Sequence, residues 1–365
     1  MNIRQVAERN GPFATVCIDA SHDTEDAAHQ TELRWRSIHD QLAGDGASDR
    51  MLAALDAAIA ETPPGEGRSG RLLIADDEAV LVDERLPDPP AREIVRVSPM
   101  PYLLPLIEKE AEQVPHVVAV VDRVGCDLRA VDEHGTAVGE TVQGDEHPVH
   151  KVPGGGWAHL SMERRVEETV RRNIDEVAQE VSALADRVHA DVVVLAGEVA
   201  ARSALHNAMP KHGDIPEHGA EIVEIEAGGR AEGIDTEAFD SEVHQAVAHA
   251  AEQRRRAVLD RFAAERERPG GLAVAGLTAT TEALRMANVD RLLIDESALG
   301  DRVVRVGSGP GQVDADGGGL VEETARACRA DEALPVAALA VGASITPVGE
   351  DMTLPDGVGA LLRHR

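Results

Sequence analysis

The sequence predicts a mixed α/β (α+β) protein of three domains. Apolar runs of strand length alternate with stretches of helical periodicity along the whole chain. The 365 residues exceed one ordinary hydrophobic core and suit two or three domains of about 100–150 residues each. Breaks in the pattern near Gln113 and at Pro269-Gly270-Gly271 place the predicted domains at 1–113, 114–268 and 269–365.

The first domain is predicted to begin with a strand, because Phe13–Asp19 is an apolar run. Trp35, Ile38 and Leu42 recur at helical spacing, and a second helix over about 49–61 stops at a Pro- and Gly-rich turn. The remaining predicted elements are a hairpin over 71–82, a strand over 93–97 and a short helix over 102–111.

The second domain is predicted to open with two strands, 117–122 and 127–131, that form a hairpin at Gly125. A polar loop rich in His and Gly follows from Gln143 to about Ser161. The helix after it carries an apolar stripe at helical spacing, formed by Val166, Val170, Ile174, Val177, Val181, Leu184 and Val188. The elements that complete a βαβαβ order are a strand over 191–196, a helix over 200–209 and a strand over 222–225, before a long helix over 236–268.

The third domain alternates again between helical and strand patterns. We predict a helix over 278–287 and strands over 291–295 and 303–306. A glycine-rich loop at 314–319 is predicted to precede a helix over 320–329. The apolar run 336–345 is predicted to be a buried strand.

The charge of the chain is strongly acidic, with 66 Asp and Glu against 36 Lys and Arg. Only Lys109, Lys151 and Lys211 are lysines. A surface of carboxylates with few ammonium groups stays hydrated in concentrated salt, so the composition indicates a salt-adapted protein. Its net charge then carries no information about partners, and only local arginine clusters can indicate nucleic-acid binding.

Cysteine usage and the ends of the chain point to the cytoplasm. The three cysteines, Cys17, Cys126 and Cys328, are far apart and form no CxxC motif, which fits a reducing compartment. The first residues lack the apolar segment of a signal peptide, and no apolar run is long enough to span a bilayer. We therefore expect a soluble cytoplasmic protein with no membrane partner.

Three motifs together resemble a known family. A glycine-rich segment, Pro153 to His159, opens the long helix of the second domain, and Arg164-Arg165 follow about one turn later. The C-terminal stretches 330–343 and 356–363 are the most distinctive. With them the chain resembles the bacterial and archaeal relatives of class-1 release factors, of the Pelota and Balon type. The actinobacterial members of this group are also described as Vms-like peptidyl-tRNA hydrolases.

The resemblance implies an architecture and partners. The first domain would face the decoding centre of the ribosome, and the βαβ-type middle domain would carry the glycine loop 153–159 toward the peptidyl-transferase centre. The third domain would be an α/β/α sandwich like the kink-turn-binding proteins and would contact a translational GTPase related to elongation factor Tu. The expected partners are therefore the ribosome, with its rRNA and tRNA, and this GTPase. The family pattern also implies a monomer.

The tip of the glycine loop departs from the family pattern. Release factors place a Gly-Gly-Gln tip beside the ester of peptidyl-tRNA, and the position of the glutamine matches Trp157 here. An indole N–H donates a hydrogen bond but cannot accept one from a water. Trp157 suits stacking on an unpaired base, while the alternative is that it packs on its own domain. If the loop is catalytic nonetheless, the candidates are Gly155, Gly156 and Trp157, acting through backbone N–H groups.

The RNA-binding candidates are the glycines and the cations around the loop. They are Gly154, Gly155, Gly156, Trp157, His159, Arg164, Arg165, Arg171 and Arg172. The arginines suit rRNA phosphates, but Glu167 and Glu168 also lie four residues before Arg171 and Arg172, as on any solvated helix face. The cluster Arg254-Arg255-Arg256 is interpreted as such a solvated face.

Metal and cofactor chemistry is not expected. His147, His150 and His159 flank the loop near Asp145 and Glu146, yet their spacing matches no zinc pattern. A second set of polar residues is interpreted as part of a loop: His212, Asp214, Glu217 and His218. The sequence contains no P-loop, no GxSxG and no HExxH motif.

Three functions remain open from the sequence. The favoured one is a ribosome A-site-binding protein that acts in hibernation or protection without releasing peptide. The second is a peptidyl-tRNA ester hydrolase or ribosome-rescue factor that uses the same loop. The third is an RNA-binding stress protein that acts through residues from Gly270 onward.

Overall fold

The structure, a computed structural model, falls into two compact units. Unit 1 comprises residues 1–111 and 257–365, and unit 2 comprises residues 112–256. The structure describes residues 2–21, 27–61, 67–86, 88–90, 92–123, 125–132, 135–143, 157–209, 220–228, 236–309, 311–315 and 325–365. Among these, only the backbone is described for 27–32, 140–143, 157–169 and 350. The three-domain boundaries near 113 and 268 stay a prediction.

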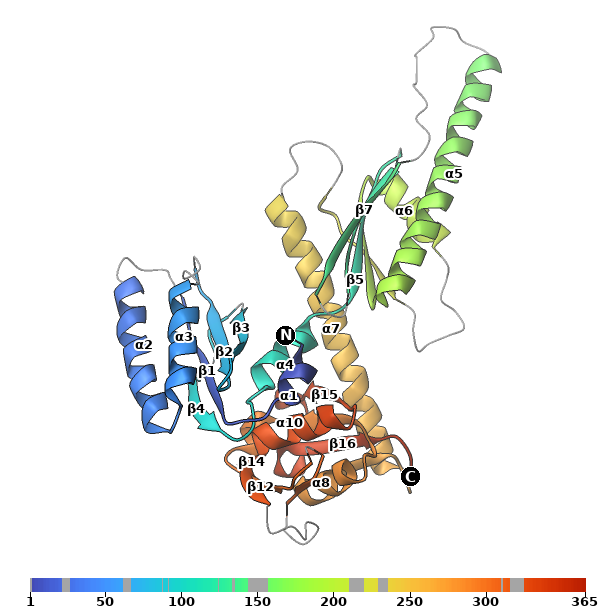
Figure 1. The fold of residues 1–365 in the computed structure, drawn as a ribbon. Helices are drawn as coiled ribbons and strands as arrows, with labels where there is room; N and C mark the ends of the chain where they lie inside the picture. Colours follow the sequence, from blue (N-terminus) through green and yellow to red (C-terminus); the bar gives the residue numbers. More distant parts are fainter. Residues whose placement is uncertain are drawn as a thin grey trace. The chain divides into compact units, whose positions relative to one another are not determined.

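The N-terminal part of unit 1 is a four-stranded sheet with helices on one face (Figure 1). Its strands, β1 (Phe13–Asp19), β2 (Gly70–Ala75), β3 (Val80–Leu86) and β4 (Ile94–Ser98), lie in the order β3-β2-β1-β4 and pair antiparallel. Helices α2 (Ala27–Gly44) and α3 (Asp49–Glu61) pack on one face through Leu42, Met51 and Leu55. These elements confirm the predicted strand, helices and hairpin of this region.

The C-terminal part of unit 1 is built on a second sheet, of order β10-β16-β11-β15. Its strands are β10 (Ala273–Ala275), β11 (Val289–Ile294), β15 (Ser344–Pro347) and β16 (Val358–Leu362). Helices α8 (Leu277–Arg285) and α10 (Ala330–Ala340) pack on one face. The last turns of α7 (Thr236–Glu267) pack on the other through Leu259 and Phe262. Helices thus cover both faces, which gives the expected α/β/α layering.

A small third sheet and several short helices complete unit 1. Strands β13 (Val313–Asp314), β12 (Val303–Val306) and β14 (Arg326–Arg329) pair antiparallel in that order. The short helices are α1 (Ile3–Ala7), α4 (Leu104–Glu112) and α9 (Glu296–Leu299). Strand β12 has the predicted bounds, because turn residues close the apolar run on both sides.

One hydrophobic core joins the two ends of the chain within unit 1. It contains Val6, Phe13 and Tyr102 from the N-terminal part together with Leu292 and Leu334 from the C-terminal part. All five side chains are buried. Residues more than 200 positions apart in sequence therefore stabilise the same core, and no local sequence pattern predicts this contact.

Unit 2 is a three-layer α/β/α domain, as the βαβαβ order predicts. Its sheet has the order β7-β6-β5-β8-β9, in which β5 (His116–Val121), β8 (Val192–Gly197) and β9 (Glu221–Glu224) run parallel. Strands β6 (Gly125–Val131) and β7 (Ala137–Gln143) are antiparallel to their neighbours. Helices α5 (Trp157–Val188) and α6 (Val199–Ala208) cover one face, and the first turns of α7 cover the other.

The structure corrects three predictions. The run 336–345 is not a strand, because α10 extends to Ala340 and β15 begins only at Ser344. An apolar run of this length suits a buried strand and a buried helix equally, and its alanines favour the helix. The predicted helix 320–329 is wrong where it is described, since Arg326–Arg329 pair with β12 as β14. The predicted loop 143–161 is too long, because α5 begins at Trp157. Strand β7, which ends at Gln143, was not predicted.

Candidate functional site

The predicted glycine tip lies immediately before helix α5. Gly154, Gly155 and Gly156 fall outside the described residues, and α5 begins at Trp157. The backbone of Trp157, His159, Arg164 and Arg165 lies in the first three turns of α5, while their side chains fall outside what is described. The glycine segment therefore leads directly into a helix of 32 residues.

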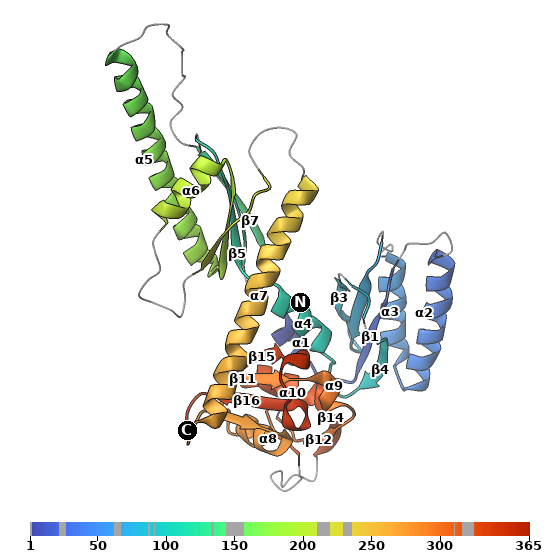
Figure 2. The same cartoon turned by 180° about the vertical axis from the view of Figure 1, so that it is seen from behind.

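The N-terminal half of α5 extends past the end of the sheet on which its other half packs, as both views of unit 2 show (Figures 1 and 2). The packed half is the predicted apolar stripe, in which Val177, Val181 and Leu184 are buried against β5, β6 and β8. Val170 is the first described residue of the stripe and is half-buried. The tip is thus carried at the end of a helix that is anchored at its other end.

Arg171 and Arg172 directly follow Val170 on α5, and their side chains are exposed. Arg172 makes a loose contact with Glu176, with 3.9 Å between Nε and Oε1, and both side chains are more than half exposed. Ion pairs of this kind between exposed side chains contribute little to stability. The partners proposed from the sequence, Glu167 and Glu168, have side chains outside the described set.

The cluster Arg254-Arg255-Arg256 is a solvated face, as predicted. Arg254 pairs with Asp191 at 2.7 Å, and Arg255 and Arg256 both pair with Glu252. These hydrogen bonds hold the pKa of Glu252 below its usual value. Each guanidinium therefore has a carboxylate of its own domain.

Sequence reasoning missed a polar cluster between α6 and β9. Arg202 is buried, donates to Glu224 Oε2 at 2.9 Å and also donates to the carbonyl of Ile225. His206 Nδ1 lies 2.6 Å from the other Glu224 oxygen. The hydrogen bond from His206, followed by that from Arg202, lowers the pKa of Glu224. The residues lie 18 and 22 positions apart and belong to no known motif spacing, so only the fold brings them together.

His116, the first residue of β5, is expected to make unit 2 sensitive to acid. Its Nδ1 donates to the carbonyl of Val114 at 2.8 Å, and burial lowers the pKa of the imidazole below its usual value of 6.5. Because the folded state holds the neutral ring, the stability present above about pH 6.5 is lost as the pH falls. We expect His116→Gln to flatten the fall in unfolding free energy of unit 2 between pH 7 and pH 5, as measured by urea denaturation. An unchanged slope in the variant would contradict this assignment.

The histidine groups considered for metal binding lie largely outside the described residues. These are His147, His150, His212 and His218, and His159 is described by its backbone alone. Within the part of the chain that the structure describes, no group of three or more His, Cys, Asp or Glu side chains is arranged to hold a metal ion. The prediction of a metal-free protein stays a prediction.

No helix among the described residues is long and apolar enough to cross a membrane.

Comparison with known proteins gives matches over the middle and over the whole of the chain. The sequence profile of bacterial archaeo-eukaryotic release factor family 2 matches residues 115–268, which include α5 and the glycine segment. Two Mycobacterium tuberculosis proteins, Rv2629 and MT2704, are each 35% identical to the chain over 371 residues. Each match covers 99% of this chain and 96% of the relative, and both relatives are described as uncharacterized.

Solved structures of release factors and Pelota are more distant. An archaeal Pelota, from a model of ribosome-bound Pelota and ABCE1, is 13% identical with a TM-score of 0.43, over 98% of this chain and 92% of that one. The archaeal termination factor aRF1 is 15% identical with a TM-score of 0.25, over 99% and 94%. Family membership therefore rests on the sequence matches, which confirm the resemblance given by the glycine segment and the C-terminal stretches. The chain belongs to the bacterial archaeo-eukaryotic release factor family.

Proposed function

We propose that this release-factor-like protein binds the A site of idle or stalled ribosomes and protects them, without releasing peptide. Membership of the release-factor family supports the ribosome as the target. The observation that carries the proposal is the projecting half of α5, which begins at Trp157 directly after three glycines (Figure 1). The end of a projecting helix suits insertion into a confined RNA-lined site.

The residue at the tip supports binding over catalysis. Where the family resemblance places a glutamine, this chain has Trp157. A tryptophan at the start of a helix offers a base a stacking surface, which contributes about 1–3 kcal/mol. It offers no acceptor with which to position an attacking water. The proposed role is therefore a plug that stacks on rRNA or tRNA.

The arginines of α5 supply the electrostatic part of the interface. Arg164, Arg165, Arg171 and Arg172 lie within the second to fifth turns of the helix. Guanidinium groups bind phosphate oxygens in pairs and remain charged at any cellular pH. In concentrated salt such contacts are weakened, so we assign them to orientation and assign the affinity to stacking.

The first test is co-sedimentation with purified ribosomes in molar KCl, with a peptide-release assay on the same complexes. We expect binding without release. Trp157→Ala is expected to weaken binding about 5- to 150-fold, the equivalent of about 1–3 kcal/mol of stacking. The matched control is Trp35→Phe, because Trp35 donates to Asp56 inside unit 1 and does not belong to α5. Equal binding by the wild type and Trp157→Ala would remove the stacking role.

A second candidate function is peptidyl-tRNA hydrolysis or ribosome rescue through backbone groups. The first N–H groups of a helix have no partner within the helix, and in α5 these follow Gly155 and Gly156. Such N–H groups can stabilise a developing oxyanion. This candidate predicts peptide release that is lost when residues 154–157 are deleted. Release by the wild-type protein would replace the plug with an enzyme.

We also propose that the part of the chain from 269 to 365 contacts a translational GTPase related to elongation factor Tu, and that the free protein is a monomer. A solved Pelota-like protein, yeast Dom34, is described as interacting with Hbs1. Pull-down with purified GTPase in its GTP-bound form, together with light scattering of the free chain, tests both statements.

A further inference from the structure

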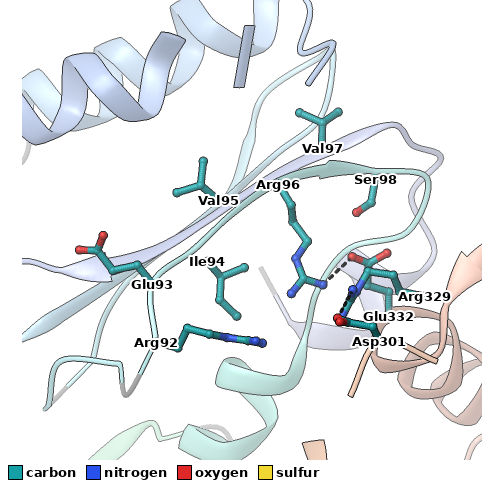
Figure 3. A pocket seen from close by; sticks show the side chains of 10 residues that line it. All are labelled: Arg92, Glu93, Ile94, Val95, Arg96, Val97, Ser98, Asp301, Arg329 and Glu332. Carbon is teal, nitrogen blue, oxygen red and sulfur yellow. Dashed lines mark hydrogen bonds and ion pairs between the residues drawn. The ribbon is translucent and has the colours of Figure 1, made fainter. Parts of the chain in front are cut away.

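The pocket in Figure 3 runs along the free edge of strand β4, within unit 1. It has a volume of about 320 Å³ and is lined by the consecutive residues 92–98 together with Asp301, Arg329 and Glu332. Strand β1 occupies one edge of β4, and each face of a strand presents only every second side chain. A pocket that borders consecutive residues therefore follows the other edge, where no strand is paired.

The pairing of β1 shows which backbone groups of β4 face this edge. The amide of Ala20 donates to the carbonyl of Ser69, so the backbone groups of Ala20 point toward β2. Because the direction alternates along a strand, those of Val16 also point toward β2 and away from β4. Val16 lies opposite Val95, so the N–H and C=O of Val95, and those of Val97 two residues on, point outward to the free edge.

These outward backbone groups have a single partner among the residues that the structure describes. The side chain of Gln41, on α2, donates from Nε2 to the carbonyl of Val95 at 3.1 Å, which agrees with its outward direction. The N–H of Val95 and both backbone groups of Val97 make no hydrogen bond to the described part of the chain. A row of unpaired backbone groups at an edge is a template for another strand.

The other edge of the same sheet is protected, whereas β4 is not. Strand β3 carries three charged residues in succession at 83–85, and its pairing with β2 is irregular between Ile74 and Ala75. Charged side chains and bulges hinder an edge strand from pairing with another chain. The pairing of β4 with β1 is regular, and its one charged side chain, Arg96, is turned away from the edge and ion-paired with Glu332 (Figure 3).

Helix α2 borders the edge of β4 and offers an apolar contact there. Val95 and Val97 pack on the side of the sheet that α2 covers, opposite to Arg96 (Figure 3). Arg34 of α2 lies 3.6 Å from Glu93, and Leu33, which precedes it, is 49% exposed. Side chains directly opposite in two paired strands lie on the same face. An added strand would therefore place every second side chain beside this helix.

We propose that the edge of β4 binds an extended segment of a partner polypeptide, which adds antiparallel to the sheet and has apolar side chains at alternate positions. Only an extended backbone presents N–H and C=O groups at the spacing of Val95 and Val97. The intervening side chains would face the ion pair of Arg329 and Asp301 and are expected to be polar. The pocket is small for a ligand site and bounded by residues of this chain, which suits one segment better than the sheet of a second copy.

The test is titration of the full-length protein in molar KCl with an acetylated heptapeptide of alternating threonine and valine. In the proposed pairing the valine amides face β4 and the threonine amides face away. We expect the peptide N-methylated at its threonines to bind like the unmodified one. The peptide N-methylated at its valines should bind at least about tenfold more weakly, because it has lost the donors to β4. Equal affinities of the two methylated peptides, or no binding of the unmodified one, would overturn the proposal.

A variant of the protein removes the same contact from the other side. Val97→Pro deletes an N–H that β1 does not use, and proline is tolerated on edge strands, so the sheet should persist. We expect peptide binding to fall at least about tenfold in Val97→Pro. The matched control is Val97→Ala, which trims the side chain but keeps the N–H and should bind close to wild type. Equal weakening in both variants would speak against pairing through the backbone.

Hydrogen exchange of the wild type, followed by NMR, makes the test independent of whether a variant folds. Adding the unmodified peptide should slow exchange of the Val95 and Val97 amides. The amide of Arg96 faces β1 and should exchange slowly with and without peptide. Unchanged exchange at Val95 and Val97 would overturn the proposal. Light scattering tests the other occupant, because a dimer that forms with rising concentration and is abolished by Val97→Pro would replace the partner segment with a second copy of the chain.

Discussion

Replacing Arg96 by methionine is expected to lower the free energy of unfolding of unit 1 by about 3–5 kcal/mol. The substitution removes the charged hydrogen-bond donor of Glu332 and one of two cations from Asp331, both carboxylates being buried. It also removes the cation from the face of the Tyr102 ring. Because Arg96 belongs to the N-terminal part of the chain and Glu332 to the C-terminal part, the loss weakens the junction between the two.

The size of this loss is expected to depend on pH. Burial raises the pKa of Glu332 and Arg96 opposes that rise, so the variant should have a still higher value. An acid whose pKa is raised on folding favours the folded state when protonated, and stability falls as the pH rises from the unfolded value through the folded one. The difference between wild type and Arg96→Met should therefore be larger at pH 8 than at pH 5.

Urea denaturation followed by tryptophan fluorescence measures this effect in a Trp157→Phe background, in which Trp35 of unit 1 is the only tryptophan. The matched control is Arg92→Met. Arg92 is 66% exposed in its pair with Glu296, so its loss should cost less than about 1 kcal/mol. If the two variants were equally stable, the buried network would contribute nothing beyond an ordinary surface pair.

Replacing Gly197 by alanine is expected to destabilise unit 2 by more than about 3 kcal/mol. Gly197 is the last residue of β8 and has a φ of 107°, a conformation that L side chains rarely adopt. A Cβ at this position would lie 2.1 Å from the carbonyl oxygen of Val121 and 2.8 Å from its nitrogen. Both are backbone atoms of the paired strand β5, so neither can move without breaking the ladder between β5 and β8.

The control for this substitution is Gly46→Ala, in the turn between α2 and α3. Gly46 has a similar φ of 97°, but nothing lies within 4 Å of an added Cβ. The loss of stability in Gly46→Ala should therefore reflect backbone strain alone, about 1 kcal/mol. Hydrogen exchange of the β5 and β8 amides measures the first effect and exchange in α2 and α3 the second. Similar protection losses at both glycines would mean that the contact with Val121 does not decide the outcome.

Many elements of this protein can be predicted from the sequence because each carries its own local signal. The strand Phe13–Asp19 and the helix Asp49–Glu61 have the predicted bounds, since an apolar run or stripe ends at residues that favour turns. The apolar stripe of α5 likewise identified the buried face, and Arg171 and Arg172 are exposed outside it as helical geometry requires. The family also followed from the sequence, through the glycine segment and the C-terminal stretches.

The candidate site was predicted less completely. The glycine segment was placed correctly before the long helix, but the projection of α5 depends on where the sheet of unit 2 ends. The pairing of Arg202 with Glu224 could not be predicted from the sequence, because a helix and an edge strand meet there only in the folded domain. No sequence interval marks such a contact.

The sequence by itself determined the α/β class, the order of most elements and the family. Each of these depends on periodicity, turn residues or motif identity within a short stretch. Tertiary structure alone decided that residues 336–340 belong to a helix, because periodicity cannot distinguish a buried helix from a buried strand in an apolar run of this length. It alone also placed Arg96 beside Glu332, 236 residues away, in a core shared by the two ends of the chain. Contacts at that separation depend on how whole elements pack against one another, and no short stretch of the sequence specifies them.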